Sequence, residues 1–121
     1  MNHIEELVQR FVSVWNETDA TRRGQEVRAL WRIDGRHVMG ANATEGHEAL
    51  EQHVVASNHR SVLEKNYVFR PATGIQALPG VIKFRWDMAH RDTNEIVSAG
   101  IGFLIIDEDH RISCDYLFAE S

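Results

Sequence analysis

Residues 81–88 read VIKFRWDM, and their alternation decides how the second half of the chain folds. From residue 83 onward every second side chain is charged: Lys83, Arg85 and Asp87. The alternate positions are apolar and include Phe84, Trp86 and Met88. Side chains of an extended strand point alternately to its two faces, so this pattern predicts a strand with one buried aromatic face and one solvated face.

The segments around this strand have a similar character. β-branched and aromatic residues dominate four more stretches, and turn-forming residues such as HRDTNE and DEDH separate them. We expect further strands at residues 67–71, 74–78, 95–106 and 111–118. Because short hairpin connections join them, they predict an antiparallel meander.

Before residue 65 the apolar residues follow a helical period instead. A first stripe recurs every three or four positions and comprises Ile4, Leu7, Val8, Phe11, Val12 and Trp15. Asn2 and Glu5 have the spacing of a capping box at its start. We expect a second helix, capped by Thr18 or Asp19, to run to about Trp31.

A short strand and a third helix complete the first half. Asp34-Gly35 predicts a turn before a strand that ends at Met39, and Thr44 is the predicted cap of the third helix. Helices followed by a meander indicate an α+β fold, in which a curved antiparallel sheet wraps around three N-terminal helices. We expect one domain over residues 1–121.

Composition narrows the functional classes. The chain has 121 residues, a net charge of −5 and scattered basic residues, which argues against a nucleic-acid-binding surface. Cys114 is the single cysteine, so no intrachain disulfide can form, and a reducing compartment is expected. The N-terminus has neither the basic start nor the apolar run of a signal peptide. No membrane span is expected, and we expect a cytoplasmic protein.

Several motifs together resemble the nuclear transport factor 2-like (NTF2-like) superfamily. They are FVSVWNETDATRRGQEVRALWRIDGRHV, TEGHEAL, VIKFRW, AGIGFLIIDEDHRI and the closing Phe118. Members include ketosteroid isomerases, SnoaL-like polyketide cyclases, scytalone dehydratase and limonene epoxide hydrolase. The resemblance implies a cone in which a bent sheet and three helices enclose an apolar pocket. It also implies a homodimer formed through the outer face of the sheet.

The polar groups of the ketosteroid isomerases are missing from this resemblance. Their catalytic base falls on Met39, their first-helix tyrosine on Phe11 and their later acid on Ile101. A thioether, a phenyl ring and an alkyl chain can neither abstract a proton nor stabilise an enolate. We therefore expect Met39 to line the pocket and exclude steroid isomerisation by the known residues.

Two histidines are candidates for the remaining chemistry. His37 lies on the same strand face as Met39, one layer deeper, and could act as acid or base near neutral pH. The alternative is a buried neutral histidine bonded to a backbone carbonyl. His53 could enter the same volume from the third helix or lie half-exposed at its edge. Two imidazoles without a third ligand do not indicate a metal site.

The last strand offers one further candidate. The register of the resemblance points Cys114, Tyr116 and Phe118 inward, and Asp115 outward to solvent or to a dimer interface. Tyr116 could then donate a hydrogen bond to a ligand or to His37, or it could be a core aromatic. Cys114 would be an inert buried thiol.

The other predicted pocket residues form flat, mainly apolar walls that suit a small ring-containing molecule. These ligand-binding candidates are Phe11, Trp15, Trp31, Met39, His53, Phe69, Phe84, Trp86, Met88, Ile101, Phe103, Cys114 and Phe118.

Three functional hypotheses follow. The chain could be an isomerase-, cyclase- or dehydratase-type enzyme with His37 as acid/base and Tyr116 as donor. It could instead be a non-catalytic binder of a hydrophobic molecule, or a dimeric interaction domain. No GxGxxG motif or phosphate-binding loop is present, so neither a nucleotide, a flavin nor a metal cofactor is expected.

Overall fold

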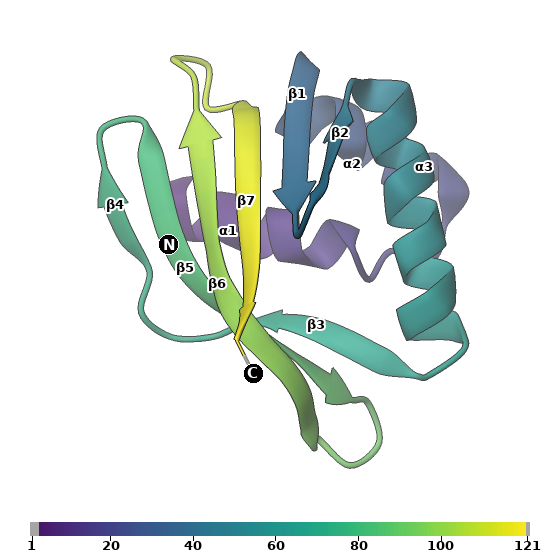
Figure 1. Ribbon diagram of the computed structural model, residues 1–121. Coiled ribbons are helices and arrows are strands. Elements are labelled where there is room, and N and C mark those ends of the chain that lie inside the picture. The colour runs from purple at the N-terminus through teal and green to yellow at the C-terminus, as the bar shows by residue number, and fades with distance from the viewer. Residues whose placement is uncertain (1–2, 121) are drawn as a thin grey trace.

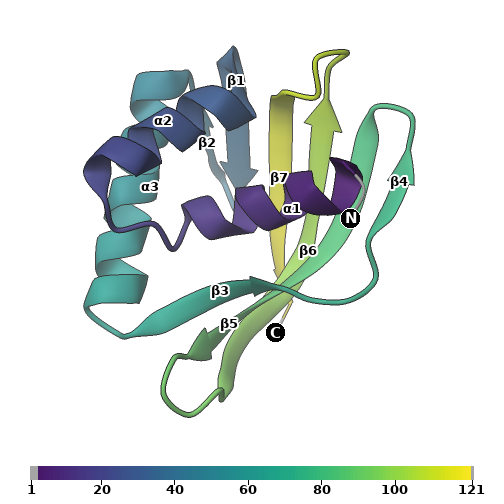
Figure 2. The same cartoon turned by 180° about the vertical axis from the view of Figure 1, so that it is seen from behind.

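The computed structural model describes residues 3–120. Helices lie against one face of a curved sheet, as the two opposite views of Figures 1 and 2 show. The helices are α1 (His3–Val14), α2 (Ala20–Leu30), α3 (His47–Ser57) and the π-helix η1 (Asn58–Leu63). The strands are β1 (Trp31–Met39), β2 (Asn42–Glu45), β3 (Tyr67–Pro71), β4 (Gln76–Leu78), β5 (Val81–His90), β6 (Ile96–Ile106) and β7 (Ile112–Glu120).

The predicted α+β class is confirmed, and the sheet differs in one respect. Its strand order is β2-β1-β7-β6-β5-β3, with β4 also paired to β5. All pairs are antiparallel except β1 and β7, which run parallel, so the sheet is mixed. Hairpin connections predict only how sequence neighbours pair, whereas β1 and β7 are brought together from opposite ends of the chain.

The helices begin and end close to the expected positions, with one exception. Asp19 caps α2 by accepting a hydrogen bond from the backbone N–H of Arg22 at 2.9 Å. Thr44 does not cap α3, because its backbone pairs with His37 in the β1–β2 hairpin and the helix starts after Gly46 instead. Asn2, the predicted cap of α1, lies outside the described residues.

The expected turn at Asp34-Gly35 is a bulge inside β1. The pairing of β1 with β7 shifts register between Trp31 and Arg36, so the chain bends without leaving the sheet. A Cβ on Gly35 would lie 2.9 Å from the Trp31 side chain. The absence of a side chain at this position therefore lets the bulge close over Trp31, which is fully buried.

Aromatic side chains fill the space between α1 and the sheet. The ring of Phe11 packs edge-on against Trp31 at 5.6 Å and against Phe84 at 5.7 Å. On β6, Gly100 and Gly102 pair directly with Trp86 and Phe84 of β5. Since these glycines carry no side chain, the two rings lie flat on the sheet and form one wall of the interior.

Within residues 3–120, no helix combines the length and the apolar character that crossing a membrane requires.

Candidate active site

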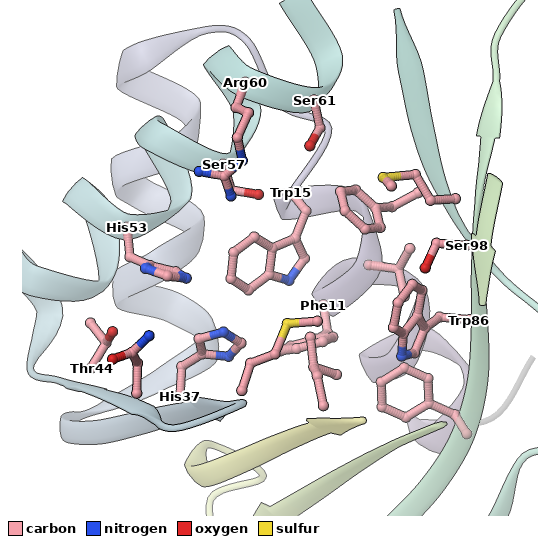
Figure 3. Close-up of a pocket in the computed structure, with 17 residues that line it drawn as sticks. Phe11, Trp15, His37, Thr44, His53, Ser57, Arg60, Ser61, Trp86 and Ser98 are labelled. Carbon is pink, nitrogen blue, oxygen red and sulfur yellow. The ribbon is translucent and has the colours of Figure 1, made fainter. Parts of the chain in front are cut away.

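A pocket of about 400 Å³ opens between the helices and the concave face of the sheet (Figure 3). This volume is in the range of small-molecule sites. Aromatic and apolar side chains from α1 and β5 make one side, and polar side chains from β2, α3 and η1 make the other. The structure places these predicted residues on its wall: Phe11, Trp15, His37, Met39, His53, Phe69, Phe84, Trp86 and Met88.

The end of α1 is held in place by two side-chain amides. Asn16 exchanges hydrogen bonds with the backbone of Phe69, donating at 2.7 Å and accepting at 2.8 Å. Asn58 donates to the carbonyl of Trp15 at 3.0 Å from the first residue of η1. These bonds tie α1 to β3 and to η1, and they position Trp15 and Phe69 at the pocket.

The expected inward face of β7 is wrong. Tyr116 and Phe118 are 37% and 56% exposed, and with Cys114 they lie on the outer face of the sheet. Their inward neighbours are Asp115, which is fully buried, and Leu117, which lines the pocket. Successive strand residues alternate between faces, so a register wrong by one residue exchanges the two sets.

The same exchange applies to β6. Ile101 and Phe103 pair with Phe118 and Tyr116 on the outer face, and neither lines the pocket. The inward positions are the two glycines opposite Trp86 and Phe84. Trp31 also lies outside the pocket wall, because its ring is enclosed in the core behind it.

Asp115 is paired with His37 at the floor of the pocket. His37 Nδ1 and Asp115 Oδ2 are 2.6 Å apart, and the other carboxylate oxygen accepts a hydrogen bond from Trp31 Nε1 at 2.9 Å. The indole can only donate, which fixes this oxygen as an acceptor. Burial raises the pKa of Asp115, while the hydrogen bonds from His37 and Trp31 act in the opposite direction.

This arrangement sets the role of the two imidazole nitrogens of His37. A carboxylate accepts from Nδ1–H, which leaves Nε2 with its lone pair. Among residues 3–120, Nε2 of His37 has no hydrogen-bond partner, and the ring borders the pocket. The nitrogen that can take or give a proton is therefore the one available to a ligand.

His53 reaches the same region from α3 and lines the pocket, which is the first of the two alternatives given for this residue above. Its ring centre lies 5.0 Å from that of His37 and 5.9 Å from that of Trp15. Desolvation lowers the pKa of His53, and electrostatic interactions with His37 and with the Arg60 guanidinium lower it further. Within residues 3–120, no three side chains of metal-ligating type come together.

Two indole N–H groups at the pocket have no partner in the part of the chain that the structure describes. They belong to Trp15 and Trp86, each only 5% exposed. In Figure 3 the nitrogen of Trp15 faces the middle of the pocket. A buried donor without an acceptor is destabilising, so an oxygen of a bound molecule would relieve it.

Sequence reasoning missed most of the polar wall. The additional lining residues are Val12, Asn42, Thr44, Ser57, Arg60, Ser61, Ser98 and Leu117. Part of this wall could have been predicted from the four-residue spacing of His53, Ser57 and Ser61, because positions four residues apart share one face of a helix.

Comparisons with known proteins identify the fold. Neither a family profile nor a curated protein matches the chain by sequence. Among solved structures, a candidate isomerase of the SnoaL-like family from Agrobacterium tumefaciens is 21% identical, with a TM-score of 0.89 over 100% of both chains. The chain has the NTF2-like fold. A candidate polyketide cyclase from Sinorhizobium meliloti is 14% identical, with a TM-score of 0.70 over 93% of each chain.

A third NTF2-like protein, from Exiguobacterium, has unknown function. It is 13% identical, with a TM-score of 0.74 over 95% of this chain and 98% of its own. The expected resemblance is thus confirmed at the level of the NTF2-like fold. Since one fold hosts many activities, the chemistry has to be argued from the pocket.

Proposed function

We propose that this chain is an acid–base enzyme that acts on a small, largely apolar, ring-containing molecule. The observation that carries the proposal is the buried His37–Asp115 pair, whose free imidazole nitrogen borders the pocket. Imidazole is the side chain best suited to exchange protons near neutral pH. The fold neighbours that are named as candidate isomerase and candidate polyketide cyclase are in keeping with this class.

The proposed step uses only groups of this chain. Nε2 of His37 accepts a proton from the ligand, and the carboxylate of Asp115 stabilises the resulting imidazolium. His37 then returns the proton to another ligand atom in an isomerisation or cyclisation, or to a departing hydroxyl in a dehydration. Asp115 acts as a positioning residue because it touches His37 and not the ligand. Neither metal nor organic cofactor is needed for this proton transfer.

The walls select the body of the ligand. Phe11, Phe69, Phe84 and Trp86 offer flat apolar surfaces, and rings stack favourably on such surfaces. The Trp15 ring lies 4.9 Å from His37 and its enclosed indole N–H is unpaired among the described residues, so donation to a ligand oxygen would orient the ligand ring relative to His37.

The test is ligand binding followed by turnover. Steroid-like, terpenoid and aromatic polyketide compounds are titrated against tryptophan fluorescence, and bound compounds are assayed for conversion by mass spectrometry. We expect His37→Gln to retain binding and to lose roughly 10²–10⁴-fold in rate. His59→Gln, the same change at an exposed histidine that does not line the pocket, is the control and should retain the rate. Conversion by His37→Gln at the wild-type rate would overturn the proposal.

A non-catalytic binder is the second candidate. The apolar groups at Met39 and Phe11, which line the pocket, favour it because neither can take part in proton transfer. Saturable binding by wild-type protein without conversion of any bound compound would support this alternative.

We also propose that two copies associate through the outer face of the sheet in the cytoplasm. Tyr116 and Phe118 are exposed there, and the Phe118 ring packs edge-on against Phe103 at 6.1 Å. Ile101 and Val38 flank these rings through the strand pairing. Exposed aromatic groups that are contiguous rather than scattered are typical of interaction surfaces.

A further inference from the structure

The helical side of the pocket carries hydroxyl groups that the fold itself does not use. Ser57 and Ser61 line the pocket and are only 8% and 9% exposed. Within residues 3–120, neither hydroxyl has a hydrogen-bond partner. Their oxygens are not among the fully enclosed unpaired polar atoms of the described residues, so both hydroxyls border open space and are available to a group that enters the pocket.

Arg60 lies beside them and supplies a positive charge. It is the one lining residue with a permanent charge, and no carboxylate lines the described pocket. In the described part of the chain Arg60 has no ion-pair partner, whereas the nearby acids Glu51 and Glu64 contact Arg28 and His59. Figure 3 shows its side chain reaching from η1 to Ser57, above Trp15 and His53.

The backbone explains why these groups converge. Residues Asn58–Leu63 form a π-helix, a wider turn that is rare and is frequently found at functional sites. Asn58 anchors its first residue to Trp15. Ser57, Arg60 and Ser61 are three and four residues apart and all reach the pocket.

We propose that Arg60, Ser57 and Ser61 form a carboxylate-binding subsite, so that the ligand is an apolar ring compound bearing a carboxylate. This inference rests on the proposed binding function of the pocket. The guanidinium and the two hydroxyls bind the carboxylate at the helical side, and the ring extends toward Trp86 and Phe84. A guanidinium matches the planar, two-oxygen geometry of a carboxylate, and such charge-assisted bonds are stronger than neutral ones. The chain as a whole carries a net charge of −5, so this unpaired arginine at the pocket is not part of a general excess of positive charge.

The test compares two probes that share a ring and differ in charge, 2-naphthoate and methyl 2-naphthoate, by isothermal titration calorimetry. We expect wild-type protein to bind the acid more tightly than the ester. Arg60→Gln should weaken acid binding about tenfold and leave ester binding within about twofold. Ser61→Ala should weaken acid binding in the same sense. Arg22→Gln, an exposed arginine on α2 away from the pocket, is the charge-matched control and should bind both probes like wild type.

The outcomes separate the two proposals. If both probes bind equally well and Arg60→Gln changes neither affinity, the carboxylate subsite is wrong while ligand binding by the pocket stands. If neither probe binds the wild-type protein, both proposals are overturned. Arg60 is exposed, so its replacement should not disturb the core. Circular dichroism of each variant checks that the fold is retained.

Discussion

The imidazole of His37 and the carboxylate of Asp115 lie 2.6 Å apart, and both side chains are withdrawn from solvent. The two residues are direct partners in the parallel pairing of β1 with β7. The pair therefore depends on contact between strands from opposite ends of the chain, and it connects the fold to the chemistry of the pocket.

Removing the carboxylate should destabilise the fold. Asp115→Ala leaves His37 Nδ1 and Trp31 Nε1 buried without an acceptor, so we expect the free energy of unfolding to fall by about 3 kcal/mol. Urea denaturation followed by tryptophan fluorescence measures the change. Asp34→Ala, at an exposed position, is the control and should unfold within about 0.5 kcal/mol of wild type. An unchanged midpoint for Asp115→Ala would show that the pair is not formed.

His53 should titrate below an ordinary histidine. Desolvation and electrostatic interactions with His37 and Arg60 lower its pKa, and a histidine with a lowered folded-state pKa binds fewer protons than the unfolded chain does. Stability should therefore decline as the pH falls from about 6.5 toward the folded-state pKa, and it should be fully present above that window.

Nuclear magnetic resonance of the imidazole protons measures this pKa directly. Arg60→Gln should raise it, because the positive charge of the guanidinium is removed. A His53 pKa above the ordinary histidine value of about 6.5 in wild-type protein would contradict the placement of the ring.

A methyl group at position 100 should disturb the sheet. A Cβ on Gly100 would overlap the carbonyl oxygen of Phe118 and lie 2.6 Å from the Trp86 ring. We expect Gly100→Ala to lower the free energy of unfolding by about 2–3 kcal/mol, since a backbone atom cannot move aside cheaply. The control is Ser98→Ala on the same strand, which adds no Cβ and should have a much smaller effect. Equal denaturation midpoints for the two variants would contradict the close packing at Gly100.

The outer face should govern self-association. Phe118→Asp introduces a charge into the exposed aromatic surface, and we expect it to shift a dimer toward monomer by at least tenfold in dissociation constant. Sedimentation velocity over a concentration series measures the shift. The control Leu78→Asp also replaces an exposed apolar side chain by a carboxylate. It lies on β4, where Leu78 is 73% exposed, and it should leave association unaltered. A monomeric wild-type protein at all concentrations would rule out this interface.

Much of the pocket wall could be predicted from local pattern. The alternation in residues 81–88 correctly placed Phe84, Trp86 and Met88 together, because strand geometry and the exclusion of charged groups from the core act over a few residues. The same reasoning put His37 and Met39 on one face. On β7 the register of the resemblance predicts Cys114, Tyr116 and Phe118 inward, and this prediction is wrong by one residue: Tyr116 and Phe118 are exposed and Asp115 is buried.

The sequence by itself therefore determined three helices, most of the strands and the class of fold they build, since these follow from short-range periodicity and backbone preference. It did not indicate β2 or the π-helix η1. Tertiary structure alone decided the parallel pairing of β1 with β7, the glycine floor beneath Trp86, and the burial of Asp115 against His37. Those features depend on register between distant segments, and a shift of one residue exchanges the buried and exposed faces of a whole strand.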